Sequence, residues 1–192
     1  MKSLTFNCLS LFWKTYLRIN GWSQRGEFPY HLRKCVIIVG PHTSAWDFVI
    51  GLGFRNTMKL KHSHFLGKQE LFQGPFGWWF KSLGGTPVDR FSRKNMVEQA
   101  VDMFRGKDDF MLALSPEGTR KKVDKLRSGF YHIAKGAGVP IVMVGLDFGK
   151  KQCVVGDHFY PSGDEAADFK RIIEFLASVE GKIPENGVAH LL

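Results

Sequence analysis

The sequence predicts an α/β fold in which helices flank a largely parallel central sheet, and three observations lead to this class. Short apolar runs alternate with longer amphipathic stretches along the 192 residues, as expected of repeated strand and helix units. Several of the runs are apolar throughout, which is typical of strands covered on both faces. Polar segments follow two of these runs directly, at the position where sheets of this kind bind ligands.

The first amphipathic stretch predicts a helix over residues 4–19. Leu9, Phe12 and Tyr16 fall on one side at helical spacing, and polar and basic residues flank them. An aromatic face with basic flanks suits a lipid headgroup layer, and the same stripe also suits packing on the domain. We therefore divide the chain into an N-terminal amphipathic helix within residues 1–25, membrane-interfacial in one of these two interpretations, and a single domain over residues 26–192.

Strands and helices alternate through the rest of the chain. The expected strands are 36–39, 63–67, 86–88, 110–114, 141–146 and 152–155. The expected helices are 45–56, 70–83, 94–105, 129–135 and 165–179. Pro75 argues against one straight helix through 70–83. The aromatic and glycine-rich composition of that stretch suits the border of an acyl-chain groove, contact with lipid or core packing.

The first chemically distinctive segment is His42-Thr-Ser-Ala-Trp-Asp47. A helix turns about 100° per residue, so two residues five positions apart do not share one face of a straight helix. His42 and Asp47 can meet if the histidine lies on the turn after the strand and the aspartate in the first turn of the next helix. A histidine that is oriented by a carboxylate can accept a proton from an alcohol. The alternative is an ordinary loop histidine beside an aspartate that the helix dipole favours.

The second segment, Ser115-Pro-Glu-Gly-Thr-Arg120, follows the strand at 110–114. Backbone amides at Gly118 and Thr119, together with the Arg120 guanidinium, make a cradle for an anion. A phosphate would repel Glu117, so we expect this carboxylate to orient an arginine or a hydroxyl. Together the two segments predict acyl transfer onto the hydroxyl of a phosphorylated molecule.

With both segments in view, the chain resembles the glycerolipid acyltransferases, the family of 1-acylglycerol-3-phosphate acyltransferases. Four blocks occur in the family's order, at residues 42–47, 84–90, 115–120 and 138–143. Ser115 stands where the family usually has an aromatic residue, which should alter packing beside the phosphate site. The membrane spans of many members have no counterpart here, so integral membrane insertion is not expected.

The resemblance implies an O-acyltransferase that moves an acyl group from a thioester to a lysophospholipid hydroxyl. The first acceptor it suggests is 1-acylglycerol-3-phosphate, and the alternative is a lyso-aminolipid or another lysolipid. His42 would be the base and Asp47 would orient it, without a covalent acyl-enzyme. Arg90 would bind the acceptor phosphate together with Arg120, the alternative for Arg90 being a surface ion pair with Asp89 or another carboxylate. A non-catalytic lipid- or anion-binding module is the remaining interpretation, which the intact histidine and aspartate disfavour.

The formal net charge of +9 indicates anionic partners. No helix-turn-helix, zinc-finger or RNP-type motif supports binding to nucleic acid, so we expect an anionic membrane surface and anionic donors. Lys68 is a candidate contact for the co-substrate, either acyl-coenzyme A or an acidic acyl carrier protein. The apolar runs fall well below the roughly 20 residues that span a bilayer, and the N-terminus lacks a clear signal-peptide cleavage site. We expect a peripheral protein on the cytoplasmic face of a membrane.

The three cysteines, Cys8, Cys35 and Cys153, are far apart and mostly set in apolar runs. This spacing predicts reduced structural thiols and gives no metal site. His62 and His64 would point to the same side of a strand, but two histidines without a third convergent ligand do not make a zinc site. We expect neither a metal nor a cofactor.

Overall fold

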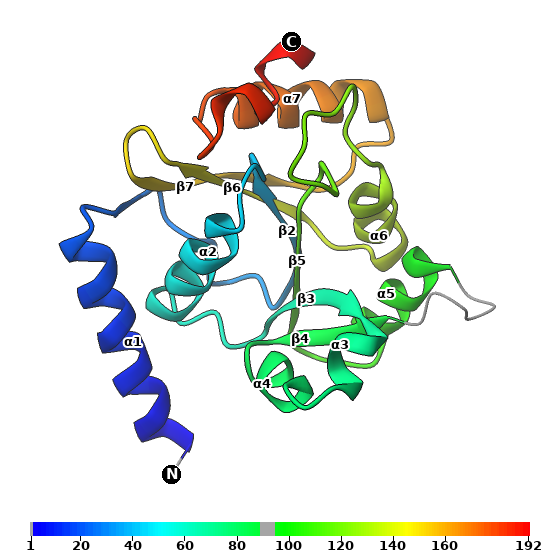
Figure 1. The fold of residues 1–192 in the computed structure, drawn as a ribbon. Helices are drawn as coiled ribbons and strands as arrows, with labels where there is room; N and C mark the ends of the chain where they lie inside the picture. Colours follow the sequence, from blue (N-terminus) through cyan, green and yellow to red (C-terminus); the bar gives the residue numbers. More distant parts are fainter. Residues whose placement is uncertain (1, 89–94) are drawn as a thin grey trace.

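The computed structural model describes residues 2–88 and 95–192, with the backbone path alone for residues 2–8 and Lys68 (Figure 1). A seven-stranded sheet forms its centre, in the order β1-β7-β6-β2-β5-β3-β4. Neighbouring described strands are parallel, except that β6 and β7 are antiparallel. The strands are β1 (Ser23–Arg25), β2 (Lys34–Gly40), β3 (Ser63–Lys68), β4 (Gly85–Val88), β5 (Phe110–Leu114), β6 (Ile141–Asp147) and β7 (Gln152–Phe159).

Helices cover both faces of this sheet, and each face has its own core. The helices are α1 (Lys2–Ile19), α2 (Trp46–Thr57), α3 (Gln69–Gln73), α4 (Gly77–Ser82), α5 (Met96–Arg105), α6 (Gly129–Ala137) and α7 (Glu165–Ala177). Val36 and Ile38 of β2 pack with α5, α6 and α7 on one face. Cys35 and Ile37 of the same strand pack with α1 and α2 on the other. The strand is apolar throughout because both of its faces are buried.

The predicted α/β class with a largely parallel sheet is confirmed, and the expected elements are present with shifted ends. Pro75 interrupts the expected helix 70–83, because α3 ends at Gln73 and α4 begins at Gly77. Strand β1 was not predicted, since its three residues are all exposed and carry no apolar pattern. The start of the helix expected at 94–105, residue 94, lies outside the described residues. Helix α5 begins after Asn95, whose side chain and that of Glu98 form a capping box.

Helix α1 packs on α2 through one side and exposes the other. Leu17 is buried, and Gly53 of α2 leaves room for Trp13 and Leu17, because a Cβ there would lie 2.9 Å from the Trp13 ring. Leu11, Phe12 and Ile19 are exposed. Among the helices that the structure describes, none combines the length and the apolar character that a bilayer crossing requires.

The described cysteine side chains are buried free thiols. Cys35 and Cys153 lie in the core beneath α2. Burial raises the pKa of each thiol to about 12, so both stay protonated and weakly nucleophilic at neutral pH. The Cys8 side chain lies outside the described residues.

Candidate active site

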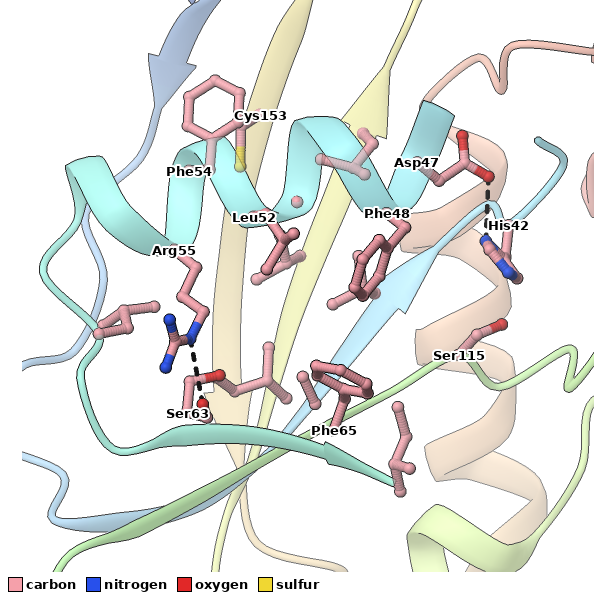
Figure 2. A pocket seen from close by; sticks show the side chains of 18 of the residues that line it. His42, Asp47, Phe48, Leu52, Phe54, Arg55, Ser63, Phe65, Ser115 and Cys153 are labelled. Atoms are coloured by element: carbon pink, nitrogen blue, oxygen red, sulfur yellow. Dashed lines mark hydrogen bonds and ion pairs between the residues drawn. The ribbon is translucent and has the colours of Figure 1, made fainter. Parts of the chain in front are cut away.

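The turn between β2 and α2 brings His42 and Asp47 together. Strand β2 ends at Gly40 and α2 begins at Trp46, so His42 lies on the turn and Asp47 in the first helical turn. The His42 Nδ1 atom lies 3.0 Å from Asp47 Oδ2 (Figure 2). The strand–turn–helix arrangement that the sequence predicted is therefore the one that the structure has.

The Asp47 carboxylate organises the whole turn. Its Oδ2 atom also accepts the backbone N–H groups of Thr43 and Ser44, each at 2.7 Å. The carboxylate side chain is only 4% exposed, whereas the His42 side chain is 30% exposed. A neutral imidazole that faces a carboxylate with Nδ1 carries its proton there and leaves Nε2 as the basic nitrogen. Ser44 has a local role, since its hydroxyl accepts the N–H of Trp46 at 3.3 Å.

Glu117 reaches the same turn from the neighbouring strand. Strands β2 and β5 are paired, so the segment that follows β5 lies beside the segment that follows β2. Glu117 is 1% exposed. Its Oε1 accepts the backbone N–H of His42 at 2.8 Å, and its Oε2 accepts the Ser115 hydroxyl at 2.7 Å. The carboxylate thus orients a hydroxyl, as expected, and also holds the backbone of His42, which the sequence did not indicate.

The rest of the second segment forms a turn with an exposed cationic side. Gly118 adopts a φ of +66°, which favours glycine, and its N–H donates to the Ser115 carbonyl at 3.3 Å. One of the two amides expected to face an anion is therefore engaged within the turn. The Thr119 hydroxyl accepts the N–H of Lys121 at 3.3 Å, and Arg120 is exposed.

Arg127 also belongs to this group, although no sequence motif singles it out. A Cβ at position 118 would lie 3.2 Å from Arg127 Cγ and 3.6 Å from its Nε, so the arginine packs over Gly118. The backbone N–H of Arg127 donates to the Pro116 carbonyl at 2.7 Å. Within residues 2–88 and 95–192, neither Arg120 nor Arg127 forms an ion pair with a carboxylate. Among the described residues, no carboxylate neutralises either guanidinium group.

An apolar cavity of about 300 Å³ lies between α2 and the sheet. His42 and Ser115 lie at one end, Arg55 and Ser63 lie at the other, and Phe48, Leu52 and Phe65 lie between them (Figure 2). Its other lining residues are mainly apolar and come from β2, β3, β5, β6, β7, α2 and the connection between α2 and β3. The mainly apolar lining suits an apolar ligand, and the histidine lies at one end of the cavity.

The aromatic stretch of α3 and α4 contributes none of the described residues that line this cavity. Phe72 fills the space between Gly67 and Gly85, where a Cβ on either glycine would lie within 3 Å of its ring. Phe76, Trp78 and Trp79 are exposed. One part of this stretch therefore belongs to the core, and the other part faces outward.

The remaining predicted binding residues fall at the limits of the described chain. Arg90 lies outside the described residues. Lys68 ends β3, and its side chain also lies outside them.

His64 lines the cavity and contacts Thr86 Oγ1 through Nδ1 at 3.2 Å. Burial, with smaller contributions from Lys107 and Arg55, lowers the pKa of His64 to about 4. His64 is therefore neutral at physiological pH.

The chain resembles known proteins in sequence and in fold. The 1-acyl-sn-glycerol-3-phosphate acyltransferase of Streptococcus pneumoniae is 33% identical over 143 residues, which cover 68% of this chain and 52% of that protein. The chain thus spans about half the length of this relative. The crystal structure of the 1-acyl-sn-glycerophosphate (LPA) acyltransferase PlsC from Thermotoga maritima matches with a TM-score of 0.59 at 17% identity, over 88% of this chain and 76% of that one. It shows the same fold.

A family model described as Acyltransferase matches residues 25–147. This range contains β2, β5, the turn with His42 and Asp47, and the segment from Ser115 to Arg120. Since the match covers more than half of the residues and both polar segments, the chain belongs to the acyltransferase family.

Proposed function

We propose that the protein is an O-acyltransferase that moves a fatty acyl group from an acyl thioester to the hydroxyl of a lysophospholipid. The favoured acceptor is 1-acylglycerol-3-phosphate, and the product is then phosphatidic acid. One observation carries the proposal: the His42 ring, fixed by Asp47 at 3.0 Å, lies at one end of an apolar cavity. A base beside an acyl-chain site suits acyl transfer to an alcohol.

The reaction follows from the orientation of the imidazole. His42 Nε2 accepts the proton of the acceptor hydroxyl as the oxygen attacks the thioester carbonyl. Asp47 stabilises the imidazolium that forms. The tetrahedral intermediate then collapses, the carbon–sulfur bond breaks, and the imidazolium returns its proton to the leaving thiolate. General base catalysis of this kind contributes roughly 10²–10⁴-fold to the rate.

The acceptor phosphate would bind on the cationic side of the second segment. Arg120 and Arg127 offer two guanidinium groups beside Gly118 and Thr119, and guanidinium groups suit bidentate phosphate contacts. Arg90 is proposed as a further phosphate ligand. Lys68 is proposed as a contact for the donor, which is acyl-coenzyme A or an acyl carrier protein. The proposal assigns no metal and no cofactor to the reaction.

The lipid acceptor implies contact with a membrane surface. Helix α1 exposes Leu11, Phe12 and Ile19 while its other side packs on α2, so an apolar side of the helix remains for contact with lipid. The net charge of +9 favours an anionic surface. We propose peripheral attachment to the cytoplasmic face of a membrane, with α1 at the interface.

The test is the release of free thiol from an acyl-coenzyme A or acyl-carrier-protein donor, with and without lysophosphatidic acid. Wild type should release thiol in an acceptor-dependent manner, and His42→Ala should lose this release. His132→Ala, which removes an exposed histidine from α6, is the matched control and should keep it. Equal turnover in His42→Ala and wild type would overturn the proposal. Release with lyso-aminolipids alone would replace the acceptor and leave the chemistry in place.

A further inference from the structure

A segment beyond the family match contacts the turn that carries His42. The family model covers residues 25–147, whereas residues 180–183 follow α7; we call these four residues the C-terminal brace. The Glu180 carbonyl accepts the N–H of Phe148 at 2.7 Å, which ties the brace to the end of β6. The Ile183 N–H donates to the Thr43 hydroxyl at 3.1 Å. The brace therefore connects the sheet directly to the residue that follows His42.

Gly181 makes this contact close. A Cβ at position 181 would lie 2.7 Å from Thr43 Cγ2 and 2.9 Å from Thr43 Oγ1. Both distances are shorter than a real Cβ contact, so a larger residue at position 181 would displace the Thr43 side chain. Gly181 has no positive φ, and its absence of a side chain is thus explained by space and not by backbone conformation.

Thr43 transmits any displacement to Asp47. Its side chain is held by the brace and its N–H donates to Asp47 Oδ2 at 2.7 Å. The residue is 2% exposed, so it has little freedom to move independently. The same Asp47 oxygen orients His42. A shift of Thr43 would therefore disturb the geometry of the histidine and aspartate.

Helix α7 packs against the end of β2, just before the same turn begins. A Cβ at Gly40, the last residue of β2, would lie 3.0 Å from Leu176 Cδ2 and 3.3 Å from Glu117 Oε1. Thus α7 and Glu117 enclose the end of β2, and the brace encloses the turn that follows. Two parts of the chain beyond residue 147 set the position of His42.

We infer that Gly181 and Thr43 are positioning residues for the His42–Asp47 pair and that the C-terminal brace is part of the catalytic apparatus. This inference rests on the proposed role of His42 as the base. Neither residue touches the reacting groups; they act through the Thr43 N–H and Asp47. A displacement of about 1 Å at such a pair can reduce the rate by roughly 10²-fold.

The first test is Gly181→Ala, compared with Gly129→Ala as the matched control. A Cβ at Gly129 meets nothing within 4 Å. Gly181→Ala should lower kcat by about 10-fold or more with little change in the KM for the acyl donor, because the cavity is untouched. Gly129→Ala should behave as wild type. Unchanged kcat in Gly181→Ala would overturn the inference.

The second test is rescue by a compensating change. Thr43→Ser removes Cγ2, the atom closest to the new Cβ, and keeps the hydroxyl that accepts the Ile183 N–H. Adding Thr43→Ser to Gly181→Ala should restore part of kcat, because the Cγ2 contact is removed while Oγ1 stays 2.9 Å from the new Cβ. If kcat falls together with the melting temperature and Thr43→Ser restores neither, the brace contributes to stability alone and positions nothing.

The third test does not depend on turnover. In protein labelled with ¹⁵N-histidine, two-bond correlations at a pH where the ring is neutral report the tautomer of His42. Wild type should show the Nδ1–H form, Gly181→Ala a mixture, and the double variant the Nδ1–H form again. An unaltered tautomer in Gly181→Ala would contradict the positioning role. If wild type shows this tautomer but transfers no acyl group, the proposed function fails and the structural linkage stands.

Discussion

The Asp47 carboxylate accepts three hydrogen bonds through a single oxygen, and His42 supplies one of them. Oδ2 lies 3.0 Å from His42 Nδ1 and 2.7 Å from the backbone nitrogens of Thr43 and Ser44. The aspartate therefore does two things at once: it folds the turn after β2 and it selects the tautomer of the histidine. The two roles can be separated by a substitution that keeps the size of the side chain.

Asp47→Asn is that substitution. In one orientation its amide oxygen takes the place of Oδ2 and keeps the hydrogen bonds, but it carries no charge to stabilise an imidazolium. In the other orientation its NH2 group donates to Nδ1, which favours the wrong tautomer. We expect kcat to fall by about 10²–10⁴-fold while the protein stays folded, measured by steady-state kinetics and thermal unfolding. Asp157→Asn, a largely exposed carboxylate near Arg171, is the control. Wild-type kcat in Asp47→Asn would exclude the proposed role of this residue.

Ser115 and Glu117 offer a second prediction, on stability. Ser115→Ala removes the hydroxyl that donates to the buried Glu117 Oε2 at 2.7 Å. A buried acceptor that loses its donor costs about 1–3 kcal/mol, so the free energy of unfolding in urea should fall by this amount. Glu117→Gln should be milder, because its oxygen can accept the His42 N–H and its amide can donate to the Ser115 oxygen. Equal stability of Ser115→Ala and wild type would show that the hydrogen bond contributes nothing.

Arg120 and Arg127 should act on the phosphate of the acceptor and not on the chemistry. Replacing either by alanine removes charge-assisted hydrogen bonds worth about 1.5–3 kcal/mol, which corresponds to roughly 10–100-fold in KM for 1-acylglycerol-3-phosphate. Turnover of an acceptor without phosphate, such as 1-acylglycerol, should not change. Lys170→Ala, an exposed cation on α7, is the control. If Arg120→Ala alters neither KM nor kcat, Arg120 does not belong to the site.

The sequence was sufficient for the elements that define the site and for the meeting of His42 and Asp47. Strands β2, β5 and β6 are apolar on both faces, so they are recognisable without partners, and a strand–turn–helix with these residues allows few geometries. The contact of Glu117 with the His42 backbone was not predicted, because it depends on the pairing of β2 with β5. The contact between Gly181 and Thr43 was not predicted either. The two residues are far apart in the chain, and one sequence does not show whether a glycine is needed because a Cβ would collide with a neighbour.

The cavity and the position of Arg127 could not be predicted from the sequence either, because both depend on how side chains pack in the folded protein. Pro75 and the aromatic residues near it drew attention to α3 and α4, yet the cavity lies under α2, where side-chain volumes decide how much space remains. Gly51 illustrates this, since it appears in the sequence as a helix-weakening residue but lines the cavity in the structure. Arg127 lies in no motif of the sequence, and only the folded turn places it over Gly118.

Gly51 gives a prediction about acyl-chain length. A Cβ at this position meets nothing within 4 Å, so a side chain would enter open space beside the cavity. Gly51→Leu should lower kcat/KM for long-chain donors more than for short-chain donors. Gly51→Ala is the control, and it should keep the wild-type preference and raise stability by about 0.5–1 kcal/mol through helix propensity. An unchanged chain-length profile in Gly51→Leu would mean that the acyl chain lies elsewhere.

His64 should contribute to the pH dependence of the free energy of unfolding. Burial lowers its pKa to about 4 in the folded protein, against roughly 6.5 in the unfolded chain. Between these pH values the unfolded chain binds more protons than the folded protein. The contribution of the neutral His64 ring to the free energy of unfolding is therefore fully present above about pH 6.5 and is lost as the pH drops towards 4. We expect His64 to account for about 1–2 kcal/mol of this loss, after allowance for solvent screening of a partly exposed ring. His64→Gln keeps a polar contact for Thr86 without a titrating group, so its free energy of unfolding in urea should decrease less between pH 7 and pH 4. Equal losses in the two proteins would show that the ring gains its proton as easily in the folded state as in the unfolded one.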